Sequence, residues 1–142
     1  MFEQNILLKI NVEDFCKAIE FYTKKLNFIL IEDIIKADTG KRWIMISPPN
    51  SRQIGIVLVK KKKFHKKIQN ENIYKQKAFL CLDSIDFWED YYKMISAEIE
   101  FIKAPKYCDF GIMASFSDLD GNFWNLLQSD YKNIFPKTNV VN

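Results

Sequence analysis

The chain offers few side chains that could act as nucleophiles, bases or metal ligands. His65 is the only histidine and stands in a lysine-rich stretch rather than in a predicted strand, so we interpret it as a surface residue. Cys81 has no histidine to serve as its base, and we interpret it as a small buried apolar residue. Asp118 and Asp120 stand in a turn, where carboxylates commonly accept hydrogen bonds from nearby backbone amides. The sequence contains no Ser-His-Asp set and no glycine-rich phosphate loop.

The composition is that of one globular domain. The 142 residues are 48% apolar and 15% aromatic, with only 4 Gly and 4 Pro, which argues against a disordered chain and against a turn-rich all-β sandwich. The three cysteines have no paired spacing, so a disulfide framework is not expected. No apolar run has the length of a bilayer span, and the N-terminus shows no signal segment. We therefore expect a cytoplasmic protein without a membrane partner.

The positive charge is concentrated in one short segment. The formal net charge is +3, but the segment from Lys60 to Lys67 contains six lysines, and the 15 other basic residues stand against 18 acidic ones. A lysine run can contact phosphates, yet no basic helix stripe or aromatic stacking platform accompanies this one. We interpret the segment as a solvated connector and expect no nucleic-acid partner. An interaction module that uses this segment as its contact is an alternative.

The chain repeats one pattern of elements. Aligning Asp14 with Asp83 superposes two helical patterns, each with apolar residues on one face. Both aspartates stand where an N-cap accepts hydrogen bonds from backbone amides, and Asn27 stands where a helix end takes the left-handed conformation. The predicted helix-face residues are Phe15, Ala18, Ile19, Tyr22 and Leu26, then Ser84, Phe87, Trp88, Tyr91 and Ile95.

Each predicted helix follows one strand and precedes three, which predicts an α+β fold. The predicted strands are 6–12, 28–35, 42–47 and 54–60 in the first half, and 76–82, 99–103, 112–116 and 123–128 in the second. Within one domain of residues 1–142, this pattern gives module one over about 5–60, a linker at 61–75, module two over about 76–129 and a tail at 130–142.

Two motifs carry a family resemblance. The first is Asp14 followed by Phe21-Tyr22 and Leu26-Asn27-Phe28; the second is Asp118-Leu119-Asp120-Gly121-Asn122 leading into Phe123-Trp124-Asn125-Leu126. Together they resemble the vicinal oxygen chelate superfamily of glyoxalases, bleomycin-resistance proteins and extradiol dioxygenases, with Asn27 and Leu119 in place of the usual Gly and Pro. The resemblance covers about residues 5–129. It implies a single glyoxalase/bleomycin-resistance-like domain, in which two tandem βαβββ modules form a curved mixed sheet with a concave ligand cleft.

Catalytic members of this superfamily hold a divalent metal ion with two ligands from each module, which His, Gln or Glu supply. The resemblance places the four positions at Leu7, Gly55, Lys77 and Asn125. Leu and Gly have no side-chain donor, and a lysine ammonium repels a cation, so only Asn125 could bind a metal ion. We therefore expect no metal ion and no other cofactor.

The same register predicts which side chains face the cleft, because residues two apart in a strand share a face. Lys9 and Lys77 on this face would favour an anionic ligand; lysines that reach water from strand ends are the alternative. Gly55 suits either ligand access or close packing. Trp43, Tyr107 and Phe110 could form a stacking wall or belong to the core. The predicted ligand-binding residues are Leu7, Lys9, Asn11, Gly55, Val57, Lys77, Phe79, Phe123 and Asn125.

The resemblance and the missing metal donors favour a metal-independent small-molecule binding protein that sequesters or senses a small aromatic or anionic ligand. A metal-dependent lyase, isomerase or dioxygenase of the same superfamily is the alternative, and it requires a different alignment of the ligand positions. An apolar concave sheet would leave a large exposed patch on a monomer, and similar antibiotic-binding members form dimers. We therefore expect a homodimer.

Overall fold

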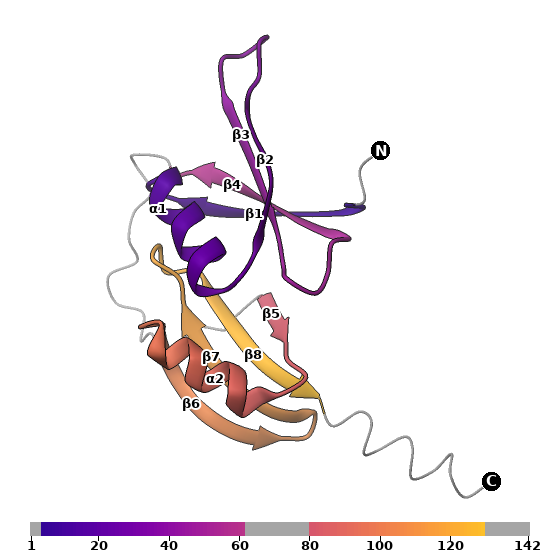
Figure 1. The fold of residues 1–142 in the computed structure, drawn as a ribbon, viewed down its shortest axis with the longest axis vertical. Helices are drawn as coiled ribbons and strands as arrows, with labels where there is room; N and C mark the ends of the chain where they lie inside the picture. Colours follow the sequence, from indigo (N-terminus) through magenta and orange to yellow (C-terminus); the bar gives the residue numbers. More distant parts are fainter. Residues whose placement is uncertain (1–3, 62–79, 130–142) are drawn as a thin grey trace, which may run out of the picture. The chain divides into compact units, whose positions relative to one another are not determined.

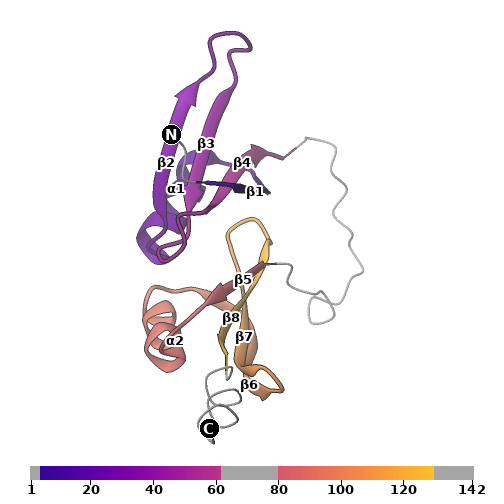
Figure 2. The ribbon, with the colours of Figure 1, turned by 90° about the vertical axis from the view of Figure 1, so that its right-hand side faces the viewer.

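The computed structural model describes residues 4–61 and 80–129, and the chain divides into two compact units, residues 1–68 and 69–142. Each unit has one four-stranded mixed sheet and one helical segment, in the same order along the chain (Figure 1, Figure 2). The predicted α+β class with two similar modules is confirmed. The predicted linker beyond Lys61, the start of predicted strand 76–82 and the C-terminal tail lie outside the described residues.

The elements of the first unit are β1 (Ile6–Val12), α1 (Phe15–Glu20), η1 (Phe21–Lys25), β2 (Ile29–Ile35), β3 (Arg42–Ser47) and β4 (Ile54–Lys60). The strand order is β1-β4-β3-β2, with β1 parallel to β4 and the other pairs antiparallel. The sequence predicts one regular helix over 15–26. The structure instead changes from α-helical to π-helical geometry at Phe21.

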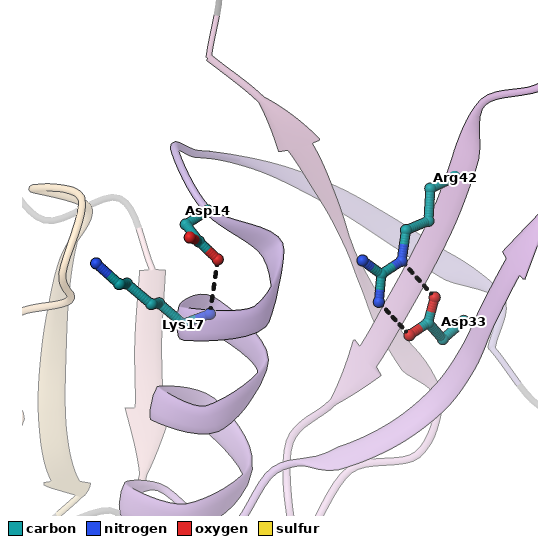
Figure 3. Close-up of polar contacts among 4 residues, drawn as sticks. All are labelled: Asp14, Lys17, Asp33 and Arg42. Carbon is teal, nitrogen blue, oxygen red and sulfur yellow. Dashed lines mark hydrogen bonds and ion pairs between the residues drawn. The ribbon is translucent and has the colours of Figure 1, made fainter.

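Local signals set both ends of this helical segment. The Asp14 carboxylate accepts a hydrogen bond from the Lys17 backbone amide at 3.0 Å (Figure 3), as an N-cap does. Asn27 follows the segment with a φ of 60°, the left-handed conformation that Asn tolerates. Tyr22 and Leu26 are buried. The helix face predicted from the sequence therefore packs into the core of this unit.

The second unit repeats the arrangement with β5 (Leu80–Asp83), α2 (Phe87–Ser96), β6 (Glu100–Cys108), β7 (Gly111–Ser117) and β8 (Phe123–Ser129). The strand order is β5-β8-β7-β6, again with one parallel pair, β5 and β8. The register between β6 and β7 shifts twice, after Phe101 and after Lys103.

No helix within the described ranges combines the length and the apolar character that crossing a bilayer requires.

The start of α2 differs from the prediction. Asp86, not Asp83, is the N-cap, and its carboxylate accepts a hydrogen bond from the Glu89 backbone amide at 3.2 Å. Asp83 is the last residue of β5. The N-caps of the two units are thus 72 positions apart (86 minus 14) instead of 69. Phe87 is buried, whereas Trp88 on the predicted apolar face is 41% exposed.

Each sheet has one buried apolar face. In β1, Ile10 and Val12 are buried, whereas Leu7, Lys9 and Asn11 are exposed. The same alternation holds in the second unit, where one face of the sheet is formed by buried Leu80, Ala114, Phe116, Trp124 and Leu126.

The acidic turn before β8 is a structural element. Asp118 is buried, and its Oδ1 accepts hydrogen bonds from the backbone amides of Asp120 and Asn122, both at 2.8 Å. Gly121 has a φ of 79°, which glycine adopts without strain. The prediction that Asp118 bonds its own turn is confirmed.

Candidate functional site

The face of the first sheet that carries Lys9 is built from rows of paired residues. In one row Lys9 pairs with Val57, Val57 with Met45 and Met45 with Glu32. Because directly paired residues present their side chains to the same face of a sheet, this row has a cation at one edge, apolar groups in the middle and a carboxylate at the other edge. Val57 and Met45 are buried, whereas Lys9 is exposed.

Lys9 and Glu32 do not neutralise each other. They stand three strand spacings apart, about 14 Å, which is beyond the reach of an ion pair. No salt bridge between residues of the described ranges includes Lys9. Glu32 was not among the predicted site residues, because the register of β2 shifts between Leu30 and Glu32 and such a shift changes which side chains share a face.

Gly55 allows close packing on this face. It pairs with Leu7 in the parallel ladder, and a Cβ atom at this position would lie 2.7 Å from Met45 Sδ and 2.9 Å from Leu7 Cδ2. The ends of two apolar side chains therefore occupy the space that a larger residue would take. Close packing, one of the two roles predicted for Gly55, agrees with these distances; its role in ligand access stays a prediction.

Other charges of this unit are paired beside α1. Arg42 donates hydrogen bonds of 2.8 and 2.7 Å to the Asp33 carboxylate (Figure 3), and its guanidinium carbon lies 5.6 Å from the centre of the Phe15 ring. The hydrogen bonds from Arg42 hold the pKa of the Asp33 carboxyl below its usual value. The Lys60 ammonium lies 5.0 Å from the same ring. Lys9, by contrast, stands on the opposite side of the sheet and is exposed.

A polar row crosses the face of the second sheet that carries Asn125. Cys81 pairs with Asn125, Asn125 with Ser115 and Ser115 with Lys103. The Ser115 hydroxyl donates a hydrogen bond to Asn125 Oδ1 at 2.6 Å, and Asn125 Nδ2 lies 3.8 Å from Cys81 Sγ. A primary amide has two N–H groups and two oxygen lone pairs, so Asn125 keeps the capacity for a further hydrogen bond to a ligand.

Two residues of this row differ from the sequence analysis. Cys81 is exposed, so its predicted buried role is wrong; Leu80 and Leu82 take the helix side of β5, and the residue between them faces away. Lys103 was missed as a cation of this face. The two register shifts of β6 on either side of Lys103 alter the alternation that a sequence pattern would follow.

The other predicted site residues fall in three places. Phe123 is buried in β8, opposite Ser117 of β7. Asn11 is exposed at the end of β1. Lys77, Phe79 and also His65 lie outside the described residues.

Of the three residues suggested as a stacking wall, one belongs to the first unit and two belong to the second. Trp43 is half-buried, with the Lys36 ammonium 4.7 Å from its ring centre. Tyr107 and Phe110 are exposed at the β6–β7 hairpin, so neither belongs to the core.

Residues 6–126 match the sequence profile of the Glyoxalase/Bleomycin resistance protein/Dioxygenase superfamily. The chain belongs to this superfamily. A protein of Shewanella frigidimarina (strain NCIMB 400), described as uncharacterized, is 40% identical over 121 residues, which cover 85% of this chain and 90% of the relative. The family predicted from the two sequence motifs is therefore confirmed.

Solved structures of the superfamily have the same fold. TnmS3, an antibiotic binding protein from Streptomyces sp. CB03234, is 25% identical with a TM-score of 0.68, and the match covers 87% of this chain and 93% of that one. A superfamily member from Sphaerobacter thermophilus DSM 20745 is also 25% identical, with a TM-score of 0.71 over 87% of this chain and 95% of that one.

The described residues do not fit the divalent metal ion that catalytic members of the superfamily bind. Leu7 and Gly55, which the family resemblance assigns to the two ligand positions of the first unit, pair directly and have no side-chain donor. In the second unit, Asn125 Oδ1 accepts from Ser115. Within residues 4–61 and 80–129, no three His, Cys, Asp or Glu side chains are grouped as metal ligands. A hard divalent ion needs several nitrogen or oxygen donors. Of Leu7, Gly55 and Asn125, only Asn125 offers a donor, its side-chain amide.

Proposed function

We propose that this superfamily member is a small-molecule binding protein that works without a metal ion and sequesters or senses a small aromatic or anionic ligand. The pairing of Leu7 with Gly55 supports this most strongly. Metal-dependent relatives need two donors at these positions, whereas here Leu7 and Met45 side chains fill the space over Gly55. This region of the sheet is therefore suited to apolar contact with a ligand.

The polar groups of the two sheet faces suggest the ligand class. Lys9 next to Val57 offers a cation beside an apolar surface in the first unit. In the second unit, Asn125 and Lys103 offer an amide and a cation in one row. An aromatic body would contact the apolar side chains, and a carboxylate, sulfonate or phenolate would accept from the amide or the ammonium groups. The residues proposed to bind the ligand are Leu7, Lys9, Asn11, Gly55, Val57, Lys77, Phe79, Phe123 and Asn125, and Lys103 is added from the structure.

TnmS3 is an antibiotic binding protein that has the same fold and is 25% identical to this chain. This likeness supports a binding role. A fold alone does not determine function, so the proposal depends chiefly on the side chains of the two sheet faces that carry Lys9 and Asn125.

Thermal shift measurements test the ligand class. Naphthalenesulfonate should raise the melting temperature of chelator-treated protein more than uncharged naphthalene does, because a ligand that binds only the native state stabilises it. Lys9→Met with Lys77→Met should remove the preference for the sulfonate and keep the response to naphthalene. The control variant Lys17→Met with Lys41→Met changes the net charge equally at exposed positions elsewhere. If both variants lost the preference for the sulfonate equally, only the net charge of the protein would be involved, and the proposed site would be refuted.

We further propose that the protein is cytoplasmic and that it forms a homodimer. Exposed apolar residues of β1 such as Ile6 and Leu7 favour association. Sedimentation equilibrium at tens of micromolar should give twice the chain mass of 16.9 kDa. A single-chain species throughout would refute the dimer and leave the ligand proposal unaffected.

A further inference from the structure

The outer side of α2 carries an apolar stripe without a described neighbour to cover it. Trp88, Tyr92 and Ile95 are 41%, 60% and 45% exposed, and Ile85, just before the helix, is 85% exposed. The spacing of four positions from Trp88 to Tyr92 and three from Tyr92 to Ile95 places these residues along one side of the helix. We call these four residues the α2 stripe.

The α2 stripe is distinct from the side of α2 that holds the unit together. Phe87 and Met94 are the buried residues of α2. Trp88 and Tyr92 stack on each other with ring centres 5.9 Å apart, so the stripe presents a continuous aromatic surface. Aromatic residues that are clustered and exposed in this way are typical of a surface that another segment covers.

The described chain ends beside this stripe. The Ser84 backbone amide donates to the Leu127 carbonyl at 2.8 Å, and the Phe87 amide donates to Gln128 Oε1 at 2.7 Å. The end of β8 at Ser129 therefore adjoins the connection between β5 and α2 (Figure 1). Residues 130–142 continue from this point.

Residues 130–142 are long enough to extend along α2, and they contain residue types that suit contact with the α2 stripe. Tyr131, Ile134 and Phe135 are apolar or aromatic. The six residues from 130 to 135 can span about 20 Å when extended, whereas the ten residues of α2 are about 15 Å long. The first turn of α2 carries Glu89 and Asp90, and the segment carries the cations Lys132 and Lys137.

We propose that residues 130–142 of the same chain bind the α2 stripe, with Tyr131, Ile134 and Phe135 as the contacts. The segment starts at the N-terminal end of the stripe, so no long connection has to be ordered, and binding within one chain has a high effective concentration. The interaction would cover the exposed aromatic surface of α2 and attach the C-terminus to the second unit.

Acrylamide quenching of Trp88 fluorescence in the full-length protein tests this proposal. The Trp88 contribution is obtained by subtracting the signal of Trp88→Phe in each background. In the variant Ile134→Ser with Phe135→Ser, the Trp88 emission should move to longer wavelength and its quenching constant should rise. Phe110→Ser is the matched control, because Phe110 is an exposed aromatic of the β6–β7 hairpin, and it should change neither quantity. An unchanged Trp88 signal in the double variant would overturn the proposal.

Hydrogen exchange provides the reciprocal measurement from the stripe side. Amides of residues 131–135 should exchange more slowly in the wild-type protein than in Ile85→Ser with Ile95→Ser, and this difference should not depend on protein concentration. Both substitutions are at exposed positions, and circular dichroism checks that the variant is folded. Equal exchange in the two proteins would overturn the proposal. A difference that disappears on dilution would also overturn it, because the stripe would then bind a second copy.

Discussion

Replacing Tyr22 by alanine is a direct test of the core of the first unit. Tyr22 is 1% exposed and lies in the π-helical turn η1. Its ring makes edge contacts with Phe21 and Phe28, each with ring centres 5.2 Å apart. The substitution removes the ring from both contacts and leaves a cavity beneath the helical segment.

The expected cost follows from the burial of this side chain. A buried aromatic ring removes about 150–250 Å² from water, and at about 25 cal/mol per Å² this corresponds to about 4–6 kcal/mol as an upper estimate. Measured truncations of buried aromatic residues to alanine cost about 3–5 kcal/mol. We therefore expect Tyr22→Ala to lower the free energy of unfolding by about 4 kcal/mol.

Urea unfolding followed by circular dichroism measures this change. With an m value of about 2 kcal/mol per molar, the midpoint should fall by about 2 M. Tyr107→Ala is the matched control, because it is the same chemical change at a side chain that is 71% exposed, and it should cost less than about 0.5 kcal/mol. Tyr22→Phe separates the contribution of the hydroxyl from that of the ring. Equal midpoint shifts for Tyr22→Ala and Tyr107→Ala would refute the assigned core.

Three further predictions follow from the caps, the ion pair and the metal positions. Asp86→Ala should lower the free energy of unfolding by about 1 kcal/mol through the lost N-cap, whereas Asp83→Ala should have a smaller effect; urea midpoints compare the two. Arg42 lowers the pKa of Asp33 in the folded state. The stabilisation from this pair is therefore fully present above the pKa that Asp33 has in the unfolded chain, and it is lost as the pH falls through the pKa that Asp33 has in the folded protein. Asp33→Asn should thus lose less stability than the wild type between about pH 6 and pH 3, by a small margin since the pair is solvent-exposed; melting curves at each pH show the difference. Zn²⁺, Ni²⁺, Fe²⁺ or Mn²⁺ should leave the melting temperature unchanged, and a rise of several degrees with one of these ions would contradict the metal-free site.

Much of the fold follows from local signals in the sequence. The predicted ranges of β1, β3 and β4 agree with the structure at both ends, because turn residues bound each of these strands. The cap of α2 was not predictable in the same way, since Asp83 and Asp86 both precede the helix. Asp86 is selected by long-range contacts, including the hydrogen bond from the Phe87 amide to Gln128 Oε1, which joins residues 41 positions apart.

The candidate site was only partly predictable for a related reason. The pairing of Leu7 with Gly55 could be anticipated from two parallel strands and a family resemblance. The position of the Met45 side chain over Gly55 depends on how β3 packs beside β4, which no local pattern encodes. The register shifts next to Glu32 and Lys103 interrupt the alternation of side chains between the two faces of a strand. The face that each of these charged residues takes therefore cannot be counted from the sequence. Irregular pairing of this kind is set by the whole sheet.

A titration with naphthalenesulfonate, followed by fluorescence, tests the central claim most directly. It is carried out on chelator-treated protein and on the same protein supplied with Zn²⁺. We predict saturable binding with the same midpoint in both samples, because the pair Leu7 and Gly55 offers no metal donor. Binding that occurs only in the Zn²⁺-supplied sample, with one ion bound per chain, would contradict it.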